Sequence, residues 1–138
     1  MPRVRVTRRV HFSAAHRLQS EALTAAENSR VYGLCNSPNY HGHNYELDIT
    51  VEGEVDVATG YVIDLGELRD IAEAEVLADL DHRNLNLDVD WLREVIPSTE
   101  NLVVSIWRRL EDRIPAPGRL IRLVLWETPR NYVEYGGE

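Results

Sequence analysis

The sequence predicts an α+β fold in which an antiparallel sheet of four strands carries two helices on one face. Three observations support this: two segments with strand-like alternation come first, two segments of helical periodicity follow, and two short strands close the chain. The expected order is strand, strand, helix, helix, strand, strand. The 138 residues contain no repeat and no linker-like tract, so residues 1–138 are expected to form one domain.

The first two strands are expected at residues 3–12 and 45–51, where apolar and polar side chains alternate. A short third strand is expected at residues 61–63, after a turn-forming stretch. Residues 19–39 are polar and irregular, and they are expected to form a long loop with one helical turn near residues 22–28. Because a loop of about 20 residues is rare in a compact domain, this one is expected to be functional.

Both helices have recognisable starts. The first is expected from Asp64 to about Leu80, since Asp64 and Glu67 have the spacing of a capping box and apolar residues then recur at helical intervals. The second starts near the sequence PSTEN and ends before Pro115. The closing segment, RLIRLVLWETPRNYVEYGGE, is expected to form two strands around a Thr-Pro turn.

Charge and composition exclude several classes of function. The chain has 23 acidic and 15 basic residues, a net charge of −8, which argues against general attraction to nucleic acid or to an anionic membrane. Its single cysteine, Cys35, rules out an intramolecular disulfide. The first residues have no apolar secretory core, and no apolar run approaches the roughly 20 residues of a membrane helix. A soluble, cytoplasmic protein is expected.

Three histidines fall on strand faces that are expected to point inward. His41 and His43 are one residue apart and therefore share a face, while His16 continues the apolar face of the first strand. Three imidazoles from two strands would be the protein ligands of a catalytic zinc site, which keeps its fourth position open. A lone histidine on an apolar face is more often a packed core residue, so this alternative stays open.

The reactive candidates have structural alternatives too. Cys35 precedes His41 by six residues and is either a small buried side chain or a thiol activated in a loop. Asp81 and His82 are either an acid/base pair or part of a solvated loop. Glu127 ends an apolar row, so it either emerges at the rim or accepts paired N–H donors from a ligand.

Taken together, these segments resemble the 6-pyruvoyl-tetrahydropterin synthase family. Six stretches appear in order: FSAAHRL, GLCNSPNYHGHNYELDITVEGEVD, TGYVIDLGELRD, LDHRNLN, STEN and a closing ET…Y.GE pattern. The resemblance implies the tunnelling fold (T-fold), in which subunits join their sheets into a barrel as trimers and two trimers stack as a hexamer. It also implies a lyase that converts 7,8-dihydroneopterin triphosphate to 6-pyruvoyl-tetrahydropterin with loss of triphosphate, a step in tetrahydrobiopterin biosynthesis.

The resemblance also implies residue roles. The zinc ligands would be His16, His41 and His43. The proton-abstracting base would be Cys35, and a second acid/base pair, supplied across a subunit interface, would be Asp81 and His82. The pterin would be anchored by Glu127, with Thr99 and Glu100 beside it as further candidates.

Three other readings compete with this one. The 6-carboxytetrahydropterin synthase branch, of the 7-deazaguanine and queuosine route, uses the same substrate and zinc site, but it typically has three residues between Cys and HGH where this chain has five. The pyruvoyl product is therefore favoured. A third branch, in folate synthesis, has Glu in place of Cys, and Cys35 argues against it. A zinc-stabilised binding module without catalysis would be expected to lack the acid/base residues, which are present here.

Overall fold

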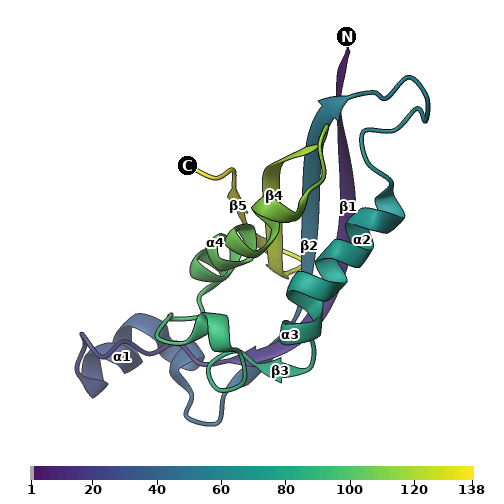
Figure 1. The fold of residues 1–138 in the computed structure, drawn as a ribbon. Coiled ribbons are helices and arrows are strands. Elements are labelled where there is room, and N and C mark those ends of the chain that lie inside the picture. Colours follow the sequence, from purple (N-terminus) through teal and green to yellow (C-terminus); the bar gives the residue numbers. More distant parts are fainter. Residues whose placement is uncertain (1) are drawn as a thin grey trace.

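The computed structural model describes residues 2–138 and contains one five-stranded sheet, with α2 and α4 covering one of its faces (Figure 1). The strands are β1 (Arg3–His16), β2 (His41–Glu54), β3 (Arg83–Asn84), β4 (Arg119–Thr128) and β5 (Asn131–Tyr135). The helices are α1 (Ala25–Tyr32), α2 (Leu65–Ala72), α3 (Ala78–Leu80) and α4 (Thr99–Leu110). The strands lie in the order β3-β1-β2-β4-β5.

The long strands β1 and β2 set the two faces of the sheet. They pair antiparallel over their whole lengths, with Phe12 opposite Tyr45. On the inner face, Phe12 and Tyr45 are fully buried and their rings stack at 4.9 Å. On the other face lie polar pairs such as Arg9 and Asp48, whose Nε and Oδ1 atoms are 2.6 Å apart. The predicted alternation of both strands is therefore confirmed, and it gives the sheet one apolar and one polar side.

The sheet differs from the predicted one by being mixed and five-stranded. The additional strand, β3, pairs parallel with β1 at Ala14 and Ala15. Two residues are too short to leave a periodic signal, which is why the sequence did not indicate it. The strand predicted at residues 61–63 is wrong: Val62 and Ile63 pack into the core, but the Tyr61 carbonyl closes a turn by accepting from the Asp56 amide at 2.9 Å.

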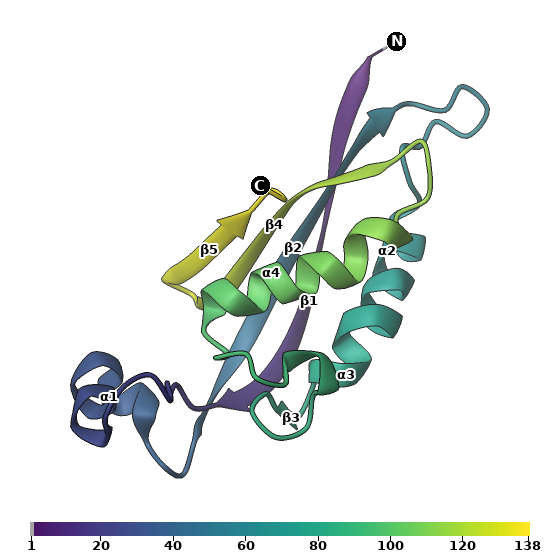
Figure 2. The ribbon, with the colours of Figure 1, turned by 60° about the vertical axis from the view of Figure 1, so that its left-hand side comes forward.

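The two predicted helices are confirmed. The first runs through α2, a π-helical turn (Glu73–Leu77) and α3, and begins where the Asp64 carboxylate accepts from the Gly66 amide at 2.8 Å. The second is α4, whose N-cap Ser98 accepts from the Asn101 amide. Figure 2 shows both lying across the same face of the sheet. Across residues 2–138, no helix has the length and apolar character needed to cross a membrane.

The long loop between β1 and β2 is more ordered than predicted. It contains a full helix, α1, and then a 3₁₀ turn (Gly33–Asn36). The start of α1 is a capping box: the Glu27 amide donates to Thr24 Oγ1 at 3.1 Å, and the Thr24 amide donates to Glu27 Oε1 at 2.9 Å. The short length of α1 and its weakly apolar surface explain why its periodicity was missed.

Candidate metal centre and active site

The three histidines meet at one end of the β1–β2 pair. The antiparallel register places His16 opposite His41, and His43 two pairs further along, opposite Ala14. Because His41 and His43 share a face, all three rings converge, with one nitrogen of each lying within 4.8 Å of the others. His16 is fully buried and the other two are partly buried. The predicted cluster is therefore confirmed as a group that could hold a metal ion.

The surroundings of His16 and His41 favour their neutral imidazoles. Burial lowers the pKa of His16, and the neighbouring His41 and His43 lower it further. Burial also lowers the pKa of His41, followed by the effect of His43. The two Nε2 atoms of His16 and His41 are 3.0 Å apart. Neutral imidazole is the form that binds metal, so the lowered pKa values suit a ligand cluster.

The hydrogen bonds of the cluster also fit a metal. The Nδ1–H of His16 donates to the carbonyl oxygen of Pro97 at 2.7 Å, which leaves its Nε2 lone pair available to a metal. Within residues 2–138, His41 Nδ1 and His43 Nε2 are buried without a hydrogen-bond partner. Buried nitrogens are rarely left unpaired in native proteins, and a metal ion would account for the free nitrogen of His43.

Glu127, from β4, lies beside the cluster. One of its carboxylate oxygens is 3.9 Å from His43 Nε2 and accepts a hydrogen bond of 2.7 Å from the hydroxyl of Thr99. Thr99, at the start of α4, is only 7% exposed. Of the candidates at this end, Glu127 and Thr99 are therefore brought together. Glu100 is exposed, and no described contact links it to the histidines.

A pocket of about 610 Å³ opens beside His43 and Glu127. This is within the usual size range of small-molecule sites. Arg9 and Trp126 are among the other residues that line it, and the guanidinium of Arg9 lies 5.7 Å from the Trp126 ring centre. The sequence did not indicate Trp126, because its alternating place on β4 gave no sign that a pocket opens there.

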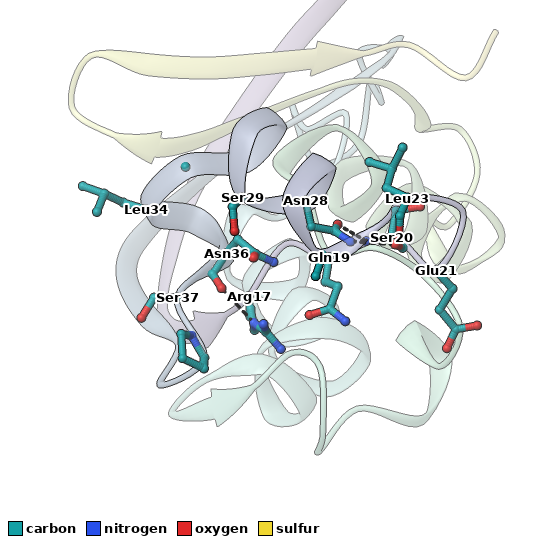
Figure 3. Close-up of a pocket in the computed structure, with 13 residues that line it drawn as sticks. Arg17, Gln19, Ser20, Glu21, Leu23, Asn28, Ser29, Leu34, Asn36 and Ser37 are labelled. Atoms are coloured by element: carbon teal, nitrogen blue, oxygen red, sulfur yellow. Dashed lines mark hydrogen bonds between the residues drawn. The ribbon is translucent and has the colours of Figure 1, made fainter.

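The segment that carries Cys35 is tied to the end of β1. The Leu18 amide donates to the Cys35 carbonyl at 2.8 Å, and Arg17 Nε donates to the Asn36 carbonyl at 3.0 Å. Figure 3 shows the Arg17–Asn36 bond at the edge of a hollow of about 620 Å³ bordered by α1. The half-buried Cys35 is thereby anchored to the two residues that follow His16.

Cys35 and Glu127 also act on a common neighbour of the histidines. The pKa of Tyr45 is raised, mainly by burial and then by the charges of Glu127 and Cys35. The Tyr45 ring packs edge-on against those of His16 and His43, at 6.3 and 5.6 Å between centroids. The thiol and the carboxylate thus both lie near Tyr45, which packs against the cluster.

Asp81 and His82 form a pair, although adjacent residues often point apart. His82 Nδ1 lies 3.0 Å from Asp81 Oδ1, which also accepts from the Ser13 amide at 2.9 Å. The Ser13 amide, followed by His82, lowers the pKa of Asp81. The His82 amide donates to the Ser13 carbonyl, so the pair is held at the β3 side of β1. Their side chains are 43% and 82% exposed, and no described contact joins them to the histidine cluster.

Comparisons with known proteins agree on one family. The family model described as 6-pyruvoyl tetrahydropterin synthase matches residues 5–138. The chain is 45% identical over 133 residues to 6-pyruvoyl tetrahydrobiopterin synthase of Homo sapiens, covering 96% of this chain and 91% of that protein. It is 31% identical to a probable 6-carboxy-5,6,7,8-tetrahydropterin synthase of Halobacterium salinarum, covering 88% and 79%. The structure of Caenorhabditis elegans 6-pyruvoyl tetrahydropterin synthase superposes with a TM-score of 0.94 at 40% identity, covering 100% and 98%.

Proposed function

Since this chain belongs to the 6-pyruvoyl tetrahydropterin synthase family, we propose that it is a lyase that converts 7,8-dihydroneopterin triphosphate to 6-pyruvoyl-tetrahydropterin and triphosphate. The reaction removes triphosphate from the end of the substrate side chain. It also oxidises that side chain while it reduces the pterin ring, so no external oxidant or reductant is consumed. The work of the protein is therefore to bind the pterin, expose its side chain to acid/base groups and move protons. The whole chain, residues 1–138, would act as one domain.

The observation that carries this proposal is the convergence of three histidines with Glu127 beside a pocket of ligand size. We assign His16, His41 and His43 as the ligands of a Zn²⁺ ion, because three imidazoles without thiolates suit zinc. When bound, zinc would supply a Lewis acid that acidifies the side-chain hydroxyls of the substrate and the adjacent C–H bonds.

Cys35 would serve as the base that removes a proton from the substrate side chain. Its support is positional: the thiol belongs to a turn tied to the residues that directly follow His16, and it lies near Tyr45, which packs against the cluster. A thiolate is the reactive form of cysteine, so proton removal by Cys35 requires that form to be present when the substrate binds.

Glu127 would anchor the pterin. An ionised carboxylate accepts two parallel N–H bonds, and the amino and ring N–H groups of a pterin offer such a pair. Thr99 keeps one oxygen of Glu127 directed towards the cluster through its 2.7 Å hydrogen bond. Its contribution to substrate binding would therefore pass through Glu127, and Glu100 stays a weaker candidate because it is exposed.

Asp81 and His82 would supply the second acid/base pair to the site of a neighbouring subunit. In their own chain they are exposed at the β3 side of β1, where His82 lines a hollow of about 490 Å³ together with His43. A homohexamer of two stacked trimers, each with its sheets joined into a barrel, would bring such a pair to another chain's histidines. Closure into a barrel also pairs strand edges that would otherwise stay open.

The 6-carboxytetrahydropterin synthase reaction is the competing proposal, since it uses the same substrate. Two observations favour the pyruvoyl product: five residues separate Cys35 from His41, and the human pyruvoyl enzyme is more similar to this chain than the archaeal carboxy enzyme, at 45% against 31% identity. Loops often carry specificity, and we expect the loop between Cys35 and His41 to determine which product forms.

The test is to incubate the purified, zinc-loaded protein with 7,8-dihydroneopterin triphosphate under anaerobic conditions and to identify the products by mass spectrometry. We expect 6-pyruvoyl-tetrahydropterin and one triphosphate per substrate consumed. Mainly 6-carboxytetrahydropterin with acetaldehyde would refute the pyruvoyl assignment. No consumption of substrate would refute both and favour a binding module.

A further inference from the structure

We propose that the turn of residues 96–101, which opens α4, is a brace that orients His16 and Glu127 together, and that Asn101 is its positioning residue. The inference rests on the proposed function, because it concerns how the metal-binding and pterin-binding groups of that site are held. Neither the metal ligands nor Glu127 belong to this turn, so hydrogen bonds are what connect it to them.

Two contacts connect the turn to the site. The carbonyl of Pro97 accepts from His16 Nδ1, and the hydroxyl of Thr99 donates to Glu127, both at 2.7 Å. Pro97 and Thr99 are both buried. His16 belongs to β1 and Glu127 to β4, and β2 lies between these strands in the sheet. The turn therefore contacts one side chain from each of the two strands that flank β2.

Asn101 holds the shape of this turn from outside the site. Its side-chain Nδ2 donates to the Ile96 carbonyl at 2.9 Å, and its backbone amide donates to Ser98 Oγ at 3.1 Å. The Ser98 amide donates to the same Ile96 carbonyl at 2.8 Å. Asn101 itself is exposed, and its described hydrogen bonds reach neither His16 nor Glu127. Its two hydrogen bonds hold the residues that directly precede Pro97 and Thr99.

Such a brace has a measurable consequence. A hydrogen bond to the distal nitrogen of a ligating histidine fixes the ring and its tautomer, and losing outer partners of this kind typically lowers metal affinity about 10–100-fold. Glu127 must likewise keep its orientation to accept two N–H bonds from one ring system. If one turn sets both, loosening the turn weakens zinc binding and pterin binding together.

The experiment compares wild type with Asn101→Ala and Asn101→Asp. Both substitutions remove the donor to Ile96 and keep the backbone bond to Ser98, and Asp also keeps the size of the side chain. Arg108→Ala, at an exposed position of the same helix, is the matched control. Zinc affinity is measured by titrating the metal-free protein with Zn²⁺ in competition with a chromogenic chelator. Pterin affinity is measured on the zinc-loaded protein with 7,8-dihydroneopterin, which lacks the triphosphate and does not require turnover.

We expect both Asn101 variants to bind zinc about tenfold more weakly than wild type, and to bind 7,8-dihydroneopterin more weakly as well. Arg108→Ala should change neither, and circular dichroism should show the same metal-free fold in all four proteins. Unchanged zinc affinity in the Asn101 variants overturns the brace, and so does a loss confined to one of the two ligands. Failure of the proposed function is recognised separately, as a wild-type protein that binds zinc and converts no substrate.

Discussion

The hydrogen bond from Thr99 to Glu127 gives the sharpest prediction for the site. Replacing Thr99 by Val removes the hydroxyl and keeps the shape of a side chain that is only 7% exposed, so no cavity is created. The bond is short, at 2.7 Å, and its acceptor is a carboxylate. Hydrogen bonds to charged groups contribute about 1.5–3 kcal/mol. If that energy serves to orient Glu127 towards the pterin, KM should rise by roughly 10–100-fold, at about 1.4 kcal/mol for each factor of ten.

The assay is steady-state turnover of 7,8-dihydroneopterin triphosphate, together with equilibrium binding of 7,8-dihydroneopterin. Thr99→Ser, which retains the hydroxyl, is the control and should stay near wild type. A double-mutant cycle then tests whether Thr99 acts through Glu127: in a Glu127→Ala background, Thr99→Val should weaken pterin binding by less than about twofold. An equally large loss in both backgrounds would refute the positioning role and indicate that Thr99 contacts the substrate itself.

Four further predictions concern other groups of the site. In metal analysis, His41→Ala should lose stoichiometric zinc, whereas His11→Ala, which alters a histidine outside the cluster, should keep it. Zinc retained by His41→Ala would contradict the assigned triad. Cys35→Ala should abolish turnover yet keep the zinc content and assembly of wild type, and surviving turnover would mean that another group is the base. Because the pKa of Asp81 is lowered in the fold, its stabilising effect is present above about pH 4 and is lost as the pH falls further. The difference in the free energy of urea unfolding between wild type and Asp81→Asn should therefore shrink on acidification, and a constant difference would contradict this. Mixing and reassembling Cys35→Ala with His82→Ala should restore activity at about a quarter of the sites, while a single-chain site would restore none.

The sequence predicted the parts of the site that follow from the periodicity of strands. Alternation alone places His41 and His43 on one face, and the apolar row of β1 extends to His16. What it could not supply was the pairing register, which puts His16 opposite His41. Register depends on contacts between residues that are far apart in the chain. The sequence therefore predicted that the three rings lie on the same face, but it did not predict that one nitrogen of each lies within 4.8 Å of the others.

Other parts of the site left no signal that could be found. The acceptor for His16 is the backbone carbonyl of Pro97, and every residue has such a group. Thr99 was expected to bind substrate, but its hydroxyl is directed to Glu127. The orientation of Asp81 depends on β3, which has only two residues and pairs in parallel where an antiparallel sheet was expected. For His16 and Asp81 the decisive partner is a backbone group or an element too short to have a period, and for Thr99 it is a side chain far along the chain.

The placement of Asp81 and His82 bears on whether one chain suffices for the proposed reaction. The pair is bound by the backbone amide and carbonyl of Ser13, groups that lie in the plane of the sheet and point towards its edge. His16, three residues further along β1, points instead into the buried face. His82 nevertheless lines a hollow of about 490 Å³ together with His43, and we expect a second chain that meets the sheet edge to complete the site there. Because β3 pairs with just two of the fourteen residues of β1, most of that edge is open to such a neighbour, and the barrel in the proposed trimer would use it.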